Sequence, residues 1–342
     1  AERAGVSKST VSMVINGKAG VSPDTAHAVM KVINDLDYKP LKAARTLLSR
    51  QTLQIGFMNL VQTRTESNIE HYAYDTLIPT FAYDVARGVE DETQARGYGL
   101  LFSTQRDGRE LTKDNMPRMI SERWIDGLLL IGGGFSQRFV SQLKKHQIAM
   151  TAIGGNYSDE NVDSVYADGF GGTYQAVQHL IDLGHREIAF IDGPAAWRTN
   201  IDKKEGYVSA LMDNGLDFDP ALVAVGDYSA QSGYSCMKKL TEKSATITAV
   251  CVALDGMAIG ARRFLNEIGL HIPNDVSMIG FEDSWIATHF DPPLSTVRVD
   301  KHEMGIIGAR RLFESLDRGS RQKATKSVVS TELILRDSCK EL

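Results

Sequence analysis

Residues 4–47 read AGVSKSTVSMVINGKAGVSPDTAHAVMKVINDLDYKPLKAARTL and contain the start and stop signals of several short helices. Gly5 can close one helix, because glycine adopts the left-handed conformation without steric cost. Ser7 offers a side-chain oxygen to the free N–H groups that open the next helix. Ser22 followed by Pro23 repeats this start signal. The stretch therefore predicts a helix–turn–helix, a third helix and a short basic helix.

The residues of this stretch divide into an inward and an outward set. Apolar residues at helical spacing predict the buried face of the second helix, Val11, Val14 and Ile15, and that of the third, Ala26, Val29, Met30, Ile33 and Leu36. The outward set of the second helix comprises Lys8, Ser9, Thr10, Ser12, Met13 and Asn16. Small polar and basic residues on one helix suit the DNA major groove, which is about 12 Å wide. A helical subdomain that binds no DNA is the alternative.

Length and charge favour a DNA-binding head on a larger body. A chain of 342 residues predicts two or three domains, and 42% hydrophobic residues are ordinary for a globular protein. The net charge of −5 argues against nucleic acid when taken alone. However, residues 1–52 carry 8 Lys and Arg against 4 Asp and Glu, whereas the remainder carries 30 against 39. The basic charge that attracts phosphates is thus confined to the head.

Several function classes lack their sequence signals. Cys236, Cys251 and Cys339 have no metal-ligand spacing, so they are interpreted as thiols in a reducing compartment. No signal peptide and no apolar run of about 18 residues is present, which predicts a soluble, cytoplasmic protein. We find no nucleophile with a positioned base, no paired carboxylates and no phosphate loop. The sequence therefore predicts a protein that is not an enzyme and needs no metal or cofactor.

Beyond residue 52, short apolar runs alternate with amphipathic helices. The predicted strands are 53–60, 98–104, 126–132, 148–154, 164–168, 187–193, 221–227, 249–254 and 276–282. The predicted helices include 81–96, 171–183, 201–214, 232–243 and 257–268. This alternation predicts α/β folding, with parallel sheets covered by helices on both faces. The polar segment 61–80 is interpreted as a surface loop, with a lid over a binding site as the alternative.

Motifs along nearly the whole chain resemble the LacI/GalR family of transcriptional regulators. AGVSKSTVSMVING resembles the family's AGVS-x-x-TVS-x-V-x-N signature, and DYKPLKAARTL resembles its linker helix. FAYDVARGVEDETQARGYGLLFS, WIDGLLLIG, LIDLGHREIAFIDGP, GDYSAQSGY, LDGMAIGARRFLNEIGLHIPNDVSMIGFED and PPLSTVRVD follow in family order. His185, inside LGHREI, is accordingly interpreted as structural.

The resemblance implies a helix–turn–helix headpiece followed by a type I periplasmic-binding-protein-like body of two doubly wound parallel-sheet subdomains. The resemblance implies a headpiece with a shortened first helix at 1–37 and a hinge helix at 38–50. The first subdomain is implied at 53–155 with 286–324, and the second at 156–285 with 325–342. The chain should cross between the subdomains near residues 155, 286 and 324. In the family, the effector binds in the cleft between them.

The resemblance also implies residues for DNA binding. Base edges should face Lys8, Ser9 and Met13, and phosphates should bind Ser7, Thr10, Ser12, Asn16 and Ser22. Leu47 matches the leucine that two paired hinge helices wedge into the minor groove, with Lys42 and Arg45 on the flanking phosphates. Packing of Leu47 against the body is the alternative.

For the effector, the resemblance implies a set of residues in the cleft: Phe81, Trp197, Arg198, Lys203, Tyr228, Asp255 and Glu282. Aromatic faces suit the C–H surfaces of a sugar, and charged groups suit its hydroxyls. The chain departs from the family at Lys203, where arginine is usual, at Glu282, where aspartate is usual, and at Gly154. Arg198 could replace part of the missing arginine, and Asp255 could instead cap the helix that begins at Met257.

Together these features predict a DNA-binding transcriptional regulator, a homodimer whose operator affinity a small molecule controls, the effector being a sugar. A solute-binding protein of a transporter shares the body fold and remains the alternative. The sequence leaves open which effector binds, whether it induces or corepresses, and which operator is recognised.

Overall fold

The computed structural model describes residues 1–15, 19–36, 51–60, 80–105, 108–155, 157, 162–195, 197–244, 246–318 and 323–342. The chain divides into two compact units, Ala1–Thr52 and Leu53–Leu342. Several predictions lie outside the described residues and remain predictions: the hinge helix, the segment 61–79, and the roles of Asn16, Lys42, Arg45 and Leu47.

The first unit is helical, and its described helices begin and end at the predicted signals. They are η1 (Glu2–Ala4), α1 (Lys8–Ile15) and α2 (Pro23–Asp35). Gly5 ends η1 with a φ of 62°, and the Ser7 hydroxyl accepts a hydrogen bond of 3.1 Å from the N–H of Thr10. The Ser22 hydroxyl accepts one of 3.2 Å from the N–H of Thr25, with Pro23 in the first turn. The predicted cap chemistry is confirmed.

The apolar face of α2 is only partly buried within this unit. Val29 is buried, and Ala26 and Ile33 are partly buried, as predicted. Met30 and Leu36 were predicted to be buried, but their exposed fractions are 44% and 48%. A unit this small has little interior to offer, because the fraction of surface that can be buried falls with chain length.

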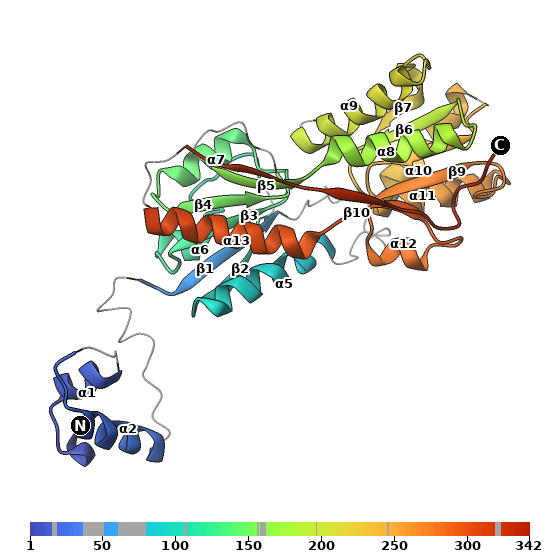
Figure 1. The fold of residues 1–342 in the computed structure, drawn as a ribbon. Coiled ribbons are helices and arrows are strands. Elements are labelled where there is room, and N and C mark those ends of the chain that lie inside the picture. Colours follow the sequence, from blue (N-terminus) through green and yellow to red (C-terminus); the bar gives the residue numbers. More distant parts are fainter. Residues whose placement is uncertain are drawn as a thin grey trace. The chain divides into compact units, whose positions relative to one another are not determined.

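The second unit contains two six-stranded sheets (Figure 1). The first sheet has the order β11-β5-β4-β3-β1-β2, and all its strand pairs are parallel. Its strands are β1 (Gln54–Leu60), β2 (Gly99–Gln105), β3 (Gly127–Ile131), β4 (Ala149–Ile153), β5 (Asp163–Ala167) and β11 (Lys326–Val329).

The second sheet has the order β12-β10-β9-β8-β6-β7, and only the pair of β10 with β12 is antiparallel. Its strands are β6 (Ile188–Asp192), β7 (Val223–Val225), β8 (Ala249–Val252), β9 (Ser277–Glu282), β10 (Ser295–Val299) and β12 (Thr331–Ile334). All nine strands predicted from apolar runs are confirmed across the two sheets.

Helices follow most strands, as expected for parallel sheets. Those beside the first sheet are α5 (Thr80–Ala95), α6 (Arg118–Ser121), α7 (Gln137–Lys144) and α13 (Lys301–Arg318). The others are α8 (Gly169–Asp182), α9 (Arg198–Asp213), η3 (Pro220–Leu222), α10 (Ala230–Lys243), α11 (Asp255–Glu267) and α12 (Trp285–His289). We call each sheet with its helices a half of the unit.

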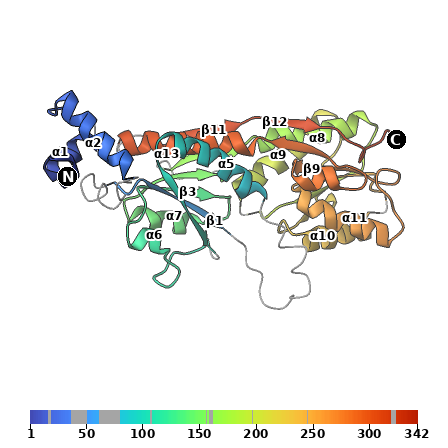
Figure 2. The same cartoon turned by 90° about the horizontal axis from the view of Figure 1, so that it is seen from below.

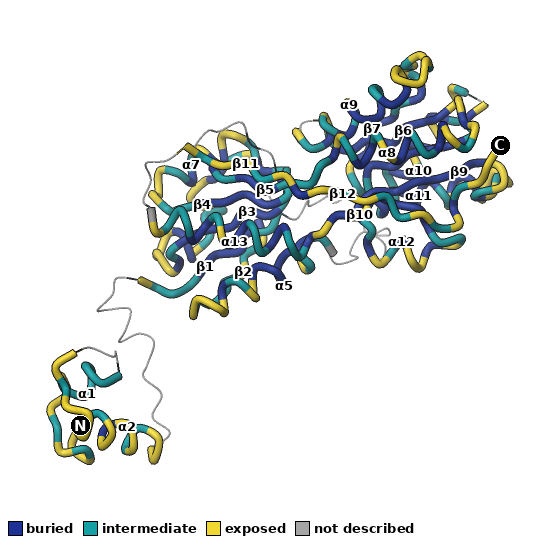
Figure 3. The backbone as a smooth tube through the Cα atoms, viewed as in Figure 1, coloured by how far each residue is buried: buried dark blue, intermediate teal, exposed yellow. Residues whose placement is uncertain are grey.

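Both faces of the first sheet are covered at its centre, which explains why β3 and β4 are largely apolar. Phe57 of β1 and Leu129 of β3 belong to one core cluster with Val85 of α5. Met58 and Leu130, their neighbours in sequence, belong to a second cluster on the opposite face. Side chains alternate between the faces of a strand, so each face needs its own cover. Figure 3 shows the resulting buried strands between less buried helices.

The chain crosses between the halves three times, at positions that differ from those predicted. β5 pairs with β4 in the first sheet, so the first crossing follows β5 rather than residue 155. β10 pairs with β9, and α13 then packs on α5, so the second crossing lies at Asp300 instead of near 286. β11 and β12 belong to different sheets, which places the third at Ser330 instead of near 324 (Figures 1 and 2). Strand pairing, which a local apolar pattern does not encode, decides these boundaries.

Candidate functional site

The first candidate site is the exposed side of α1. The side chains of Ser7, Lys8 and Ser9 are exposed at its first turn. Thr10, Ser12 and Met13 are partly buried, as are Val11, Val14 and Ile15. Lys8 offers an ammonium donor in the turn where a recognition helix meets base edges. The described part of α1 thus exposes its donors at the end that such helices present to DNA.

Two of the predicted phosphate ligands also stabilise the helices that carry them. The Ser7 hydroxyl lies 2.6 Å from that of Ser9 and 2.9 Å from that of Thr10. The Ser22 hydroxyl lies 2.8 Å from that of Thr25. These hydroxyls cap α1 and α2 and remain exposed, so the same atoms hold the helix ends and face solvent.

The second candidate site lies where the parallel strands of both sheets end. Ligands of open α/β sheets bind outside the carboxyl ends of the strands. In the first half, β3 and β4 are followed by Gly132–Gly134 and by Gly154. In the second half, five of the seven predicted effector residues lie between the carboxyl ends of β6, β7, β8 and β9 and the first residues of the helices that follow: Trp197, Arg198, Tyr228, Asp255 and Glu282.

Two aromatic rings, one from each half, rest against the glycines after β3 and β4. A Cβ built on Gly154 would lie 2.7 Å from the Cζ atom of Phe81, which belongs to α5. A Cβ built on Gly134 would lie 2.7 Å from the Cζ2 atom of Trp197, and one on Gly133 would lie 3.2 Å from its Cε3 atom. Only glycine allows this approach. Trp197 therefore bridges from the second half to the strand ends of the first.

Tyr228 extends this aromatic group within the second half. Its ring meets the Trp197 ring edge-on, with centroids 5.2 Å apart. The Tyr228 hydroxyl donates a hydrogen bond to Oδ1 of Asn200, whose amide nitrogen donates to the carbonyl of Pro194 at 2.8 Å. Burial raises the pKa of Tyr228 above its ordinary value. Asn200 was not predicted from the sequence, and the structure gives it the role of fixing the tyrosine.

Lys203 is a buried cation beneath these rings. Its Nζ donates a hydrogen bond of 2.8 Å to the carbonyl of Ala253 and lies 4.0 Å from the centroid of the Phe281 ring. Burial lowers the pKa of Lys203 to about 8, although the charges of Glu282 and Asp192 act in the opposite direction. An aromatic face and one carbonyl replace only part of the hydration of an ammonium. A bound ligand could supply further acceptors.

Both carboxylate oxygens of Asp255 accept hydrogen bonds from residues of the second half. Asp255 is fully buried, and Oδ2 accepts hydrogen bonds from the N–H and the hydroxyl of Ser284, at 2.8 and 3.1 Å. Oδ1 accepts one of 2.7 Å from the Thr296 hydroxyl. Burial raises the pKa of Asp255 to about 7. These partners lie after β9 and on β10, so the geometry gives Asp255 a structural role, but one that differs from the predicted capping of α11.

Glu282, at the end of β9, lies beside a lysine that the sequence did not predict. The Nζ of Lys301 lies 3.6 Å from Oε1 of Glu282 and donates a hydrogen bond of 3.0 Å to its carbonyl. The same Nζ lies 3.7 Å from Oδ2 of Asp84 on α5. Burial raises the pKa of Glu282, opposed by the charges of Lys301 and Lys203.

Arg198 lies at the surface. Its side chain is 51% exposed, and its Nε donates a hydrogen bond of 3.0 Å to Oδ1 of Asp202, one turn along α9. The prediction that it replaces the missing arginine of the cleft gains no support from this geometry. Lys203, on the same helix, is the buried cation of the site.

Asp192, Lys301 and Asp84 were not predicted from the sequence, although one general rule would have indicated Asp192. Asp192 is the last residue of β6, is buried, and accepts a hydrogen bond of 2.7 Å from the N–H of Gly193. Burial raises the pKa of Asp192 to about 6. Its position at the carboxyl end of a predicted strand was a usable signal. Lys301 and Asp84 lie on helices and gave no such signal.

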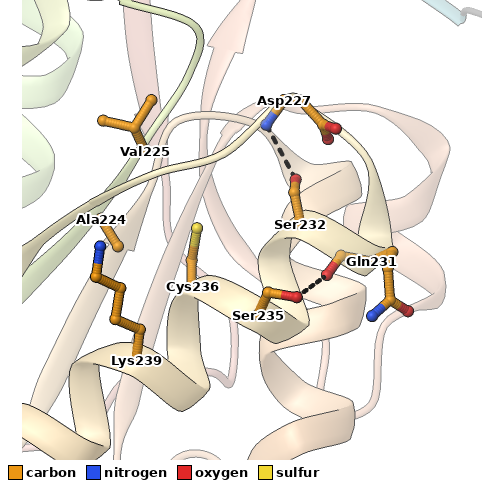
Figure 4. A pocket seen from close by; sticks show the side chains of 8 residues that line it. All are labelled: Ala224, Val225, Asp227, Gln231, Ser232, Ser235, Cys236 and Lys239. Atoms are coloured by element: carbon orange, nitrogen blue, oxygen red, sulfur yellow. Dashed lines mark hydrogen bonds between the residues drawn. The ribbon is translucent and has the colours of Figure 1, made fainter. Parts of the chain in front are cut away.

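A separate pocket lies at the outer edge of the second sheet, between β7 and α10 (Figure 4). It is lined by Ala224, Val225, Asp227, Gln231, Ser232, Ser235, Cys236 and Lys239. The N–H of Asp227 donates a hydrogen bond of 3.1 Å to the Ser232 hydroxyl at its rim. This lining contains no aromatic ring and none of the predicted effector residues, so the strand ends remain the better candidate for a sugar.

Within the described residues, no group of three or more His, Cys, Asp and Glu side chains could hold a metal ion. None of the helices described is long and apolar enough to cross a membrane. His185 is buried, with its ring nitrogens 3.0 Å from the hydroxyls of Thr248 and Ser277, which confirms its structural role.

Two family models match the chain. Residues 1–40 match the model of bacterial regulatory proteins of the lacI family. Residues 177–339 match the model of a periplasmic binding protein-like domain. The first match covers α1 and α2, and the second covers most of the second half.

Relatives match over nearly the full length. The HTH-type transcriptional regulator CelR of Thermobifida fusca is 33% identical, over 98% of this chain and 95% of the relative. The HTH-type transcriptional repressor PurR of Histophilus somni (strain 129Pt) is 30% identical, over 100% and 98%. A solved complex of the transcriptional regulator CelR with cellobiose has a TM-score of 0.72 and 30% identity, over 98% of this chain and 97% of that one.

Proposed function

The chain belongs to the lacI family of bacterial regulatory proteins and is a DNA-binding transcriptional regulator, not an enzyme, and on this premise we propose that a sugar bound between the halves of its second unit controls its affinity for an operator. The observation that carries the proposal is that Phe81 and Trp197, from different halves, lie against the glycines that follow β4 and β3.

The chemistry of this site suits a carbohydrate. Sugar rings present C–H faces that pack on aromatic side chains, and hydroxyls that need donors and acceptors. Phe81, Trp197 and Tyr228 supply the aromatic faces. Lys203 and Glu282 supply a buried donor and a buried acceptor. Because the relative CelR has been solved with cellobiose, that disaccharide is the first ligand to test.

We further propose that Lys8, Ser9 and Met13 contact base edges, while the Ser7, Thr10, Ser12, Asn16 and Ser22 side chains contact phosphates. Lysine can donate to the O6 and N7 atoms of guanine, and methionine can contact the thymine methyl group. Outside the described residues, Leu47 would enter the minor groove, with Lys42 and Arg45 on phosphates.

The working form would be a cytoplasmic homodimer on a near-palindromic operator. A helix–turn–helix dimer reads two half-sites about one helical turn apart, so a dimer predicts a two-fold-related sequence. Analytical ultracentrifugation of the full chain checks this. A monomer that binds a single half-site with full affinity would contradict it.

Sugar binding is tested by the fluorescence of Trp197, which lies against the other half. The full chain with Trp124 and Trp285 replaced by Phe is titrated with cellobiose, then with monosaccharides, sugar phosphates and nucleobases. We expect saturable emission changes for at least one sugar and none for nucleobases. The proposal fails if no sugar changes either the emission or the melting temperature.

DNA binding is tested by selecting duplexes from a random pool and then comparing Lys8→Ala with Lys31→Ala. Both lysines are exposed in the first unit, and both changes remove one positive charge. We expect Lys8→Ala to cost about 1–3 kcal/mol and to relax the preference at one base position. Lys31→Ala should have a smaller effect that is uniform across sequences. Equal losses for the two variants would contradict base recognition by Lys8. The change in affinity on adding the sugar distinguishes an inducer from a corepressor.

A further inference from the structure

Lys301 occupies the point where the chain passes from one half to the other for the second time. β10, which precedes it, belongs to the second sheet. Lys301 is the first residue of α13, which packs on α5 and the first sheet. Close backbone contacts fix that packing, since a Cβ built on Gly88 of α5 would lie 2.0 Å from the carbonyl oxygen of His302. The base of the Lys301 side chain therefore moves with α5.

The ammonium of Lys301 contacts one carboxylate from each half. Its Nζ lies 3.7 Å from Oδ2 of Asp84, in the first half, and 3.6 Å from Oε1 of Glu282, in the second. It also donates a hydrogen bond of 3.0 Å to the Glu282 carbonyl. The side chains of Lys301, Asp84 and Glu282 are 6%, 36% and 10% exposed, so little water competes for the charge.

The backbone at Glu282 is held in a costly conformation that aims it at Lys301. Glu282 has a φ of 111° and Asp283 a φ of 48°, which are left-handed values for residues other than glycine. Asp283 accepts hydrogen bonds from Arg298 at 2.8 Å and from Arg336 at 2.6 Å. Two arginines therefore hold the turn, and the Glu282 carbonyl and carboxylate both reach the same ammonium.

We infer that Lys301 is a positioning residue that ties the two halves together through its ion pairs with Asp84 and Glu282. We infer further that a ligand bound at Glu282 acts on the first half by changing these ion pairs. The inferred effect of a ligand rests on the proposed function, because it takes Glu282 as an effector contact. A sugar hydroxyl that binds the Glu282 carboxylate competes with Lys301 for it. Lys301 then keeps only its ion pair with Asp84, and the contact that holds the two halves together is weakened.

The tie can be tested without any ligand. Trp197 packs against Gly133 and Gly134 of the other half, so separation of the halves exposes its ring to acrylamide. In the full chain with Trp124 and Trp285 replaced by Phe, we expect Lys301→Met to increase the quenching of Trp197. Asp84→Asn should produce the same increase, and the double variant should add little, because both changes break one contact. Lys301→Arg, which keeps the charge, should restore most of the wild-type quenching.

Arg310→Met is the matched control. Arg310 also lies on α13 and pairs with α5, at 3.0 Å from Oε2 of Glu92, but its side chain is 56% exposed. It should leave the quenching unchanged. The inference is overturned if Lys301→Met equals Arg310→Met, or if Lys301→Met acts while Asp84→Asn does not. Should Lys301→Met fail to fold by circular dichroism, Asp84→Asn decides alone, because Asp84 is the most exposed of the three side chains.

The coupling is tested with cellobiose as the probe, followed by any sugar that binds better. The operator affinity is measured with and without saturating sugar, and the ratio of the two affinities is the coupling factor. Allosteric factors are commonly about 5–150-fold, and we expect Lys301→Met to reduce the factor towards one while the sugar still binds. An unchanged factor refutes the coupling clause. A wild type that binds no sugar refutes the proposed function instead, and leaves the quenching test of the tie intact.

Discussion

Replacing Lys203 by methionine should stabilise the second unit and abolish its response to sugar. Methionine has nearly the length of the lysine stem and packs well against aromatic rings such as Phe281. The buried ammonium of Lys203 lowers the stability of the folded chain, because it has lost most of its hydration. Removing it exchanges a desolvated charge for an apolar atom, and such exchanges are often neutral or stabilising in protein interiors.

The size of the gain follows from the pKa of Lys203. Burial lowers it from 10.5 to about 8, and each pKa unit corresponds to about 1.4 kcal/mol, so the charged form costs the folded state about 3 kcal/mol. Methionine leaves the carbonyl of Ala253 without its hydrogen bond, which costs about 1–3 kcal/mol. The difference predicts that Lys203→Met stabilises the unit by about 1 kcal/mol at pH 7.

The pH dependence separates this explanation from simple repacking. Because the pKa of Lys203 is lower in the folded chain than in the unfolded chain, the unfolded chain binds more protons between pH 8 and 10.5. Stability therefore rises with pH, by about 1 kcal/mol between pH 7 and 9 from this group alone. The methionine variant lacks this rise.

Urea unfolding of the full chain at pH 7 and 9, followed by circular dichroism, measures both effects. Lys204→Met, at the next position of α9, is the matched control and should keep the wild-type rise. A Lys203→Met variant that keeps this rise as well, or that is less stable than wild type at both pH values, refutes the reasoning. Its fluorescence response to sugar should be lost in either case if Lys203 is a ligand contact.

Three further changes test the fold around the sites. Gly260→Ala should destabilise the second unit by several kcal/mol, because its Cβ would lie 1.6 Å from a carbonyl oxygen of α10. Gly256→Ala in the same helix is the control and should be tolerated. Equal melting temperatures of the two variants would contradict this packing. Asp255→Asn should flatten the pH dependence of stability between pH 4 and 7, because the raised pKa of Asp255 makes the folded chain lose stability as the carboxyl ionises in that range; parallel pH profiles of urea midpoints would contradict it. Ser22→Ala should cost the first unit about 1 kcal/mol through loss of the α2 cap, measured by thermal unfolding of the helical signal, and an unchanged midpoint would show that the cap contributes nothing.

Helix ends and buried strands could be predicted from the sequence, because neighbouring residues determine them. Gly5, Ser7 and Ser22 end or begin helices through groups within three residues, so their roles could be derived from sequence. Apolar runs predicted nine strands, because strands buried on both faces lack polar residues. β10, β11 and β12 escaped this reasoning, because STVRV, KSVV and TELI keep charged or polar side chains, and β11 and β12 also lie at sheet edges.

The candidate site shows the same division. Phe81, Trp197, Tyr228, Lys203 and Glu282 lie at or beneath the strand ends, and their role as effector contacts stays a prediction. The arrangement around Lys301 was not predicted, because Asp84 and Glu282 approach it from 217 and 19 residues away along the chain. Pairing of distant segments also decided the crossings at Asp300 and Ser330. Such contacts depend on topology, which a single sequence does not display.

The three crossings have a consequence for synthesis. β11 and β12 complete the outer edges of the two sheets beside β5 and β10, and the ribosome adds them after all the other described strands. A chain released before residue 326 would carry finished helices α1 and α2, but β5 and β10 would each expose an unpaired row of backbone groups. Open edges of this kind promote aggregation and invite degradation. The order of the strands thus leaves both sheets unfinished in any product whose translation stops before β11, even though α1 and α2 have already been made.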